Sequence, residues 1–193
     1  MIFKMSPTSA IRSLNFIIDV ANNIDAHSDV YNIINCKNFY IWSGSSKPYQ
    51  HHYGKHGLII HTAEVLDTCI VNNDNLDAGI DKKELFYAAL FHDLGKVNDY
   101  SPVEGTDYRE WASTDHKRHI HHISRSAIIW HDFATKNNIP EENVLHAILA
   151  HHGQREWGSP VGPNTKLAWL LHLCDGISAR MCDAELWDQV HQK

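Results

Sequence analysis

The sequence predicts an all-α protein, a helical bundle with a metal site between its core helices. Apolar residues recur at helical spacing through most of the 193 residues, and no stretch shows the alternation typical of a strand. Sixteen histidines are dispersed along the chain, several of them at the edges of apolar helical runs. The length suits one domain, in which we expect residues 1–45 to form an N-terminal helical segment packed on a domain of residues 46–193.

Capping residues mark where the helices begin and end. Ser6 and Asp81 are typical N-caps, and Glu84 stands three positions after Asp81, as in a capping box. Gly95 and Gly153 are expected to end two of the helices. Together with apolar periodicity, these signals predict helices over residues 7–24, 28–40, 57 to about 72–77, 81–95, 119–136, 141–152 and 165–177, and a short terminal helix containing Trp187.

The segments between these helices are rich in turn-forming residues. Residues 43–57 and 154–164 contain glycine, serine and proline and are expected to be loops. Residues 97–115 lack sustained periodicity, and we expect them to form an excursion near the site.

Composition and charge limit the classes of function. No apolar run is long enough to span a bilayer, and the first residues lack the basic-then-apolar layout of a secretion signal. Four scattered cysteines without a C-x-x-C pair suggest reduced thiols, so we expect a cytoplasmic protein. The formal charge of −6 argues against binding of long duplex nucleic acid but not of a short substrate.

Histidines and aspartates form an ordered series, H…HD…H…HH…D. In AALFHDLGK, His92 and Asp93 follow an apolar helical run, which places an imidazole beside a carboxylate whose two oxygens can bridge two ions. Imidazole and carboxylate ligands suit Mn²⁺, Fe²⁺, Co²⁺ or Mg²⁺ better than a structural zinc, which favours cysteine. The expected metal ligands are His61, His92, Asp93, His122, His151, His152 and Asp175.

These ligands predict two divalent ions that share Asp93. The first group is His61, His92, Asp93 and Asp175, and the second is His122, His151 and His152. Two ions about 3.5–4 Å apart would activate a water for attack on phosphorus. Lys96 could neutralise charge on the phosphoryl group, so Asp93 and Lys96 are the expected catalytic residues.

The middle ligand is open between His119, His121 and His122 in HKRHIHHIS. We favour His122 because the residue four positions later, Ser126, is small and would let a neighbouring helix approach.

Residues near these ligands are candidates for substrate contacts. His51 and His52 precede the first ligand helix and could bind phosphate or protonate a leaving oxygen, or could belong to an ordinary polar loop. Arg155 and Trp157 could hold phosphate and stack on a base, although Trp157 could equally pack under its loop. Tyr108, Arg109 and Trp111 could form a lid.

The stretches that carry these residues resemble the HD-domain metal-dependent phosphohydrolases, and more closely the HD domain of YhaM-type 3′-to-5′ exoribonucleases. The resemblance spans residues 39–182 and is most specific in ILAHHGQREWGSPVGPNT and LAWLLHLCDGISARM. It implies an all-α bundle, hydrolysis of phosphoester bonds, metal-ligand roles for the seven residues above, and a Lys96 that faces substrate phosphate.

The exoribonucleases carry a β-barrel nucleic-acid module before the HD domain, whereas about 45 residues precede it here. We therefore expect a metal-dependent phosphohydrolase for a nucleotide or short oligonucleotide. A cyclic-nucleotide phosphodiesterase, a mixed-valent di-iron oxygenase on a similar scaffold, and a non-catalytic binding module remain alternatives.

Overall fold

The computed structural model describes residues 6–181, so the helix expected around Trp187 lies outside the described residues. The described part is helical apart from one small hairpin, as the sequence predicts. The elements in chain order are α1 (Pro7–Asn23), α2 (Val30–Ile34), α3 (Lys37–Ile41), α4 (Gly57–Asn75), α5 (Lys82–Phe91), α6 (Lys96–Asp99), β1 (Tyr100–Pro102), β2 (Trp111–Ser113), α7 (Asp115–His119), α8 (His122–Lys136), α9 (Glu142–Ala150), the 3-10 turn η1 (Arg155–Trp157) and α10 (Lys166–Met181).

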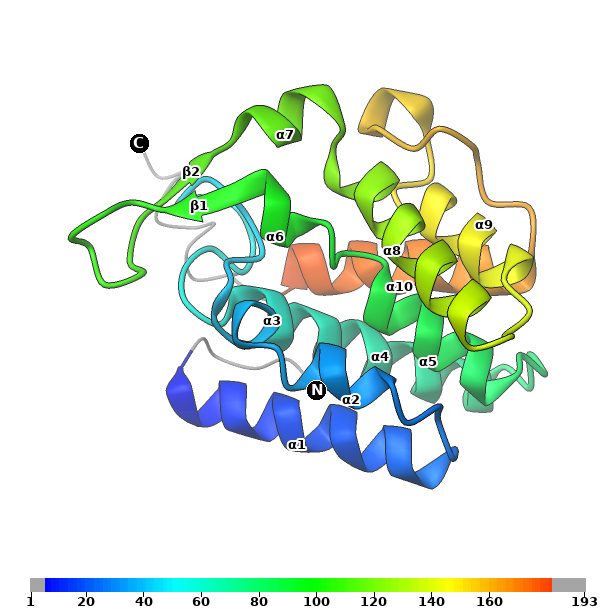
Figure 1. Ribbon diagram of the computed structural model, residues 1–193. Coiled ribbons are helices and arrows are strands. Elements are labelled where there is room, and N and C mark those ends of the chain that lie inside the picture. Colours follow the sequence, from blue (N-terminus) through cyan, green and yellow to red (C-terminus); the bar gives the residue numbers. More distant parts are fainter. Residues whose placement is uncertain (1–5, 182–193) are drawn as a thin grey trace.

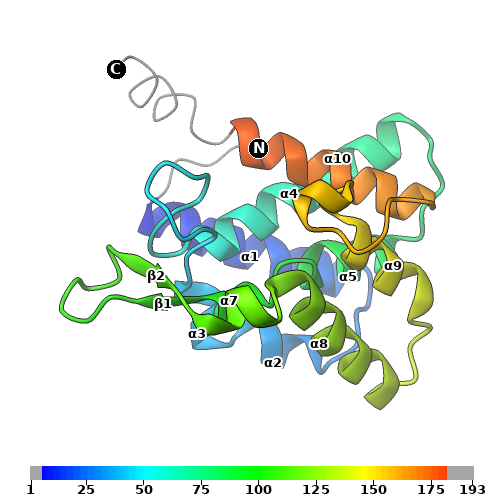
Figure 2. The ribbon, with the colours of Figure 1, turned by 90° about the horizontal axis from the view of Figure 1, so that it is seen from above.

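Helix α4 lies at the centre of the bundle. It packs against α1, α3, α5 and α10, and α1 and α10 run along different sides of it in both views (Figures 1 and 2). Residues 57–66 are buried without exception. His61 lies within this stretch, so the fold holds its imidazole inside the molecule.

An aromatic cluster joins α5 to α8. The Phe91 ring lies 5.1 Å from the Trp130 ring and 5.0 Å from the Phe133 ring, measured between centroids. Phe91 and Trp130 are fully buried. Because Phe91 directly precedes His92, this packing fixes the end of α5 against the helix that begins with His122.

The predicted N-caps are present. Ser6 Oγ accepts a backbone N–H from the first turn of α1 at 3.1 Å, and Asp81 Oδ1 accepts the N–H of Glu84 at 3.0 Å. The Glu84 carboxylate accepts from Asn143 Nδ2 at 2.7 Å, which ties α5 to α9.

The helix predicted over residues 28–40 is wrong in its continuity. It is two short helices, α2 and α3, separated at Asn35 and Cys36, where Cys36 has an extended ψ of 126°. Asn and Cys are both weak helix formers, so the local sequence favours a break.

The helix predicted over residues 119–136 begins late, at His122. The residue before it, His121, has a φ of +70°, so α7 and α8 are separate helices. Asp99 Oδ2 accepts the His122 backbone N–H at 3.0 Å, which caps α8 from a distant segment.

The expectation of no strand is also wrong, for residues 100–113. Tyr100–Pro102 pairs antiparallel with Trp111–Ser113, and the hairpin projects from the helical body at the left of Figures 1 and 2. Each strand has three residues, too short for a visible alternation. No helix of the described residues combines the length and apolarity that a membrane crossing requires.

Candidate metal centre

The ends of several helices converge on one buried polar centre. His61 comes from within α4 and Asp175 from within α10, whereas His92 and Asp93 follow α5 directly. The structure brings together all seven residues expected as ligands, which are His61, His92, Asp93, His122, His151, His152 and Asp175.

Asp93 lies between two groups of histidines, one on each carboxylate oxygen. Its Oδ2 lies 3.2 Å from His61 Nε2 and 3.4 Å from His92 Nε2. Its Oδ1 lies 3.5 Å from His122 Nε2 and 3.7 Å from His151 Nε2. The carboxylate is therefore placed to bridge two positions.

Several atoms of this cluster need a further partner. Asp93 Oδ1, His122 Nε2 and His151 Nε2 are buried and make no hydrogen bond within the described residues. Burial of an unpaired polar group costs about 1–3 kcal/mol, so such a concentration indicates a centre completed by another group. The ligand atoms of His61, His92 and Asp93 lie within 4.8 Å of one another, as do those of His122, His151 and His152, and either set could hold a divalent metal.

The other ring nitrogen of each histidine is anchored, which leaves Nε2 for the centre. This arrangement is typical of metal-ligating histidines, whose second nitrogen is held by an oxygen acceptor. The anchoring bonds from Nδ1 are His92 to Ala89 O at 2.8 Å, His151 to Ile148 O at 2.7 Å, His152 to Trp157 O at 2.6 Å and His122 to Asp99 Oδ2 at 3.2 Å.

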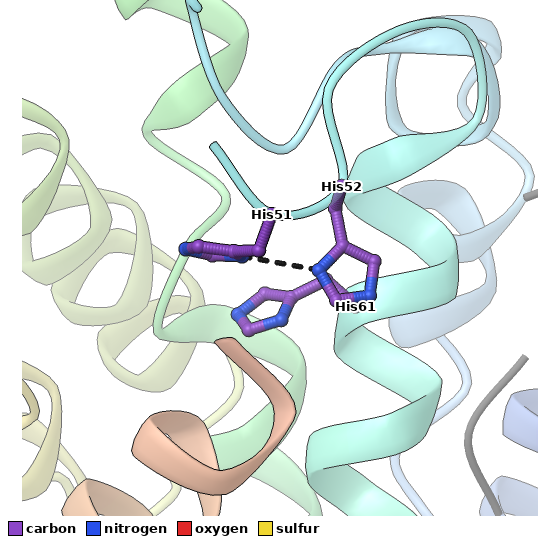
Figure 3. A group of neighbouring side chains, drawn as sticks. All are labelled: His51, His52 and His61. Carbon is purple, nitrogen blue, oxygen red and sulfur yellow. Dashed lines mark hydrogen bonds between the residues drawn. The ribbon is translucent and has the colours of Figure 1, made fainter. Parts of the chain in front are cut away.

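His61 is anchored by a buried network of Ser178 and Glu64, and Figure 3 shows the His51–His52 pair that lies beside His61. Ser178 Oγ donates to Glu64 Oε2 at 2.8 Å, so it accepts from His61 Nδ1 at 3.0 Å. His52 Nε2 donates to the same Glu64 oxygen at 3.0 Å, and His52 Nδ1 lies 3.0 Å from His51 Nδ1. Glu64 thus supports both a proposed ligand and the histidine pair beside it.

Charge keeps the two carboxylates ionised. Burial would raise the pKa of Asp93, but the Lys96 ammonium, 2.6 Å from Oδ2, and the neighbouring His92 hold that pKa well below its ordinary value. Burial would also raise the pKa of Asp175, but the hydrogen bond from His61 holds that pKa well below its ordinary value.

The pKa values of the buried histidines shift in different directions, depending on the carboxylates beside them. Burial would lower the pKa of His61, but hydrogen bonds to Asp175 and Asp93 outweigh it and raise the pKa to about 9. Burial lowers the pKa of His122 to about 4 and that of His151 well below the ordinary value. His122 and His151 are therefore neutral imidazoles, and the Nε2 of each has no hydrogen bond within the described residues.

The structure places His122, and not His119, in the cluster. His119 is exposed on α7. Ser126 Oγ accepts the Gly95 N–H at 2.9 Å, so the small residue does admit a close neighbour. Gly95 lies so close that a Cβ there would meet His122 O at 2.3 Å.

A cavity of about 380 Å³ opens beside Asp175, between the loop before α4, η1 and α10. His51 and Trp157 line it as expected for substrate contacts. His52 is fully buried against Glu64, so it supports His51 and does not reach the cavity. Arg155 is exposed but is not among the lining residues.

The sequence interpretation missed other residues of the wall, including Tyr49, His172 and Arg180. Arg180 stands five positions after Asp175 on the same helix, which was the one available signal. The lid expected at residues 108–111 is wrong for Trp111, because this side chain is 4% exposed and packs 5.0 Å from the Trp42 ring.

The fold and the centre define a helical protein with a buried His/Asp cluster that could hold divalent metal. The family pattern described as HD domain matches residues 58–180, and the chain belongs to the HD-domain family. It is 35% identical over 134 residues to the 3'-5' exoribonuclease YhaM of Bacillus subtilis (strain 168) and to the same-named protein of Bacillus velezensis.

Each alignment covers 68% of this chain and 41% of the relative, so the chain spans less than half the length of these relatives. No solved structure matches the chain significantly. The family membership and the relatives support a metal-dependent hydrolase that acts on phosphoester bonds.

Proposed function

We propose that the protein hydrolyses phosphodiester bonds of short oligonucleotides or nucleotides with two divalent metal ions bound around Asp93. The observation that carries this proposal is the position of Asp93, with two histidines near each of its carboxylate oxygens. The names of the exoribonuclease relatives support RNA as the substrate type.

The first ion would be held by His61, His92, Asp93 and Asp175, and the second by Asp93, His122, His151 and His152. The donor set fits Mn²⁺, Fe²⁺, Co²⁺ or Mg²⁺. When bound, two such ions polarise a phosphoryl oxygen and lower the pKa of a water molecule. Asp93 and Asp175 supply the negative charge that retains the ions, and the Nδ1 anchors keep the imidazoles aimed inward.

The remaining polar residues act on the substrate. The Lys96 ammonium, buried and next to Asp93, adds positive charge where the phosphoryl group gains negative charge. His51 and Trp157 line the adjoining cavity and would contact the substrate there. In the reaction, water adds to phosphorus, a P–O bond breaks, and the leaving oxygen takes up the proton.

The test is metal analysis of the purified chain followed by assay of short RNA, DNA and cyclic nucleotides with Mn²⁺. We expect bound divalent metal and release of a nucleoside monophosphate. Asp93→Ala should lose metal and measurable turnover and retain its helical circular dichroism, whereas Asp132→Ala, an exposed aspartate on α8, should behave as wild type. Full activity in Asp93→Ala or in chelator-treated protein, or iron-dependent oxygen uptake without hydrolysis, would contradict the proposal.

A further inference from the structure

Resting on this proposed function, we propose that the cavity beside Asp175 holds one nucleotide of the substrate, with its base against Tyr49 and Trp157 and its phosphate on Arg180. The cavity contacts the proposed ligands Asp175 and His152. A nucleotide bound there is therefore adjacent to the bond that the centre would cleave. The cavity has a volume of about 380 Å³, which is in the range of small-molecule sites.

The two aromatic walls are exposed in a way that packing does not explain. Tyr49 is 57% exposed and Trp157 is 53% exposed, and neither belongs to the hydrophobic core. They come from separate segments, the loop before α4 and η1. The nearest ring to Trp157 that makes an aromatic contact is His172, at 6.3 Å between centroids. The Lys47 Nζ lies over the Tyr49 ring, 5.6 Å from its centroid, so the opposite face of this ring and the Trp157 indole are the surfaces that can stack on a base.

Arg180 supplies a cation whose charge is not neutralised by a carboxylate of residues 6–181. Its side chain is exposed and its hydrogen bond is a long one, from Nη1 to Gly176 O at 3.4 Å. Arg180 lies five positions after Asp175 on α10, a rise of about 7.5 Å along the helix axis. A guanidinium at that distance can pair with a phosphate next to the one at the metal centre, and arginine is well suited to phosphate.

Two residues of α10 with small side chains form the floor of the cavity and leave its volume open. Gly176 and Ala179 line it between Asp175 and Arg180. A larger side chain at position 179 would occupy the space meant for the nucleotide. Ala179→Leu therefore fills the cavity without changing a charge or a proposed ligand.

The experiment measures binding of AMP and adenosine to the full chain without metal, by calorimetry. We expect AMP to bind about tenfold more tightly than adenosine, because only AMP offers a phosphate to Arg180. Arg180→Ala should remove that difference, and Trp157→Ala should weaken both ligands about tenfold. Arg12→Ala, an exposed arginine on α1, is the matched control and should change neither.

A second readout separates this proposal from the proposed function. Hydrolysis of the small diester methyl p-nitrophenyl phosphate with Mn²⁺ reports the metal centre alone, so Ala179→Leu should retain it and lose AMP binding. Hydrolysis combined with equal affinity for AMP and adenosine would overturn the nucleotide cavity, as would an equal loss of AMP binding in Arg12→Ala. The expected AMP binding without hydrolysis of any phosphoester would support the cavity and overturn only the proposed function.

Discussion

At the scale of single residues, Ser178 decides which nitrogen of His61 faces the centre. Its hydroxyl has one proton, which goes to Glu64, so it can only accept from the imidazole. We predict that Ser178→Ala weakens metal binding about 10–100-fold, the usual cost of losing such a partner. Titration of the metal-free protein with Mn²⁺ measures this.

The matched control for Ser178→Ala is Ser13→Ala, because Ser13 is a buried serine of α1 whose hydroxyl has no hydrogen bond within the described residues. Loss of the Ser13 hydroxyl should leave the affinity for metal unchanged. If both variants bind metal as wild type does, Ser178 does not orient His61.

His61 also makes metal binding depend on pH. Its pKa of about 9 means that the metal-free protein carries a proton on this imidazole at neutral pH. A metal ion must displace that proton, so we predict that affinity rises with pH, by about tenfold per unit between pH 7 and 9, and levels off above. Calorimetry in buffers of different protonation enthalpy measures the released proton. An affinity that is constant across this window would count against His61 as a ligand.

The order H…HD…H…HH…D predicted which residues come together, and two adjacent pairs made that order visible. These pairs are His92 with Asp93, and His151 with His152 before Gly153; each could be recognised as a candidate ligand pair because its two residues are adjacent and a turn follows. Glu64 and Ser178 are 114 positions apart, so nothing local links them. The same holds for Asp99, whose carboxylate supports His122 across 23 positions.

At the scale of elements, the contact between the turn before α6 and the start of α8 sets the position of the second ligand group. Gly95 lies against the His122 backbone, with no room for a side chain. This close approach also allows Ser126 to bond the Gly95 N–H. These contacts therefore fix the distance between the turn before α6 and the start of α8.

We predict that Gly95→Ala pushes α8 away and weakens binding of the second metal ion, because a Cβ there would lie 2.3 Å from His122 O. Metal stoichiometry should fall toward one while the protein remains helical. Gly162→Ala is the control, since its Cβ would meet its nearest atom at an ordinary 3.6 Å. Two ions bound at wild-type affinity in Gly95→Ala would contradict this account.

Helix existence was predictable from periodicity, whereas helix continuity was not. Apolar residues before and after Asn35 and Cys36 predicted one helix, and the weak helix propensity of these two residues was too slight a signal to predict that the backbone turns there. The break before His122 depends on Asp99, a residue of another element, and so lies beyond any local pattern.

At the scale of the whole molecule, the centre ties together segments from α4, α5, α8, α9 and α10. An ion that binds only this arrangement stabilises the folded state, by about 2.7 kcal/mol at a hundred times its dissociation constant. For a chain of this length we predict a rise in Tm of about 5–10 °C with Mn²⁺. Thermal unfolding with and without chelator measures it, and Asp93→Asn should show little of the shift.

Helix α1 lies outside the residues that match the family pattern but belongs to the folded core. The family match begins at residue 58 and includes every proposed ligand. Yet Ala10, Ile17 and Ala21 of α1 are fully buried in the same core as α4. A fragment that starts at residue 58 would keep every proposed metal ligand but lose Tyr49 and His51 of the cavity wall and the α1 residues that cover α4. The start of the family match and the start of the folded core therefore fall at different points of this chain, and we expect such a fragment to aggregate.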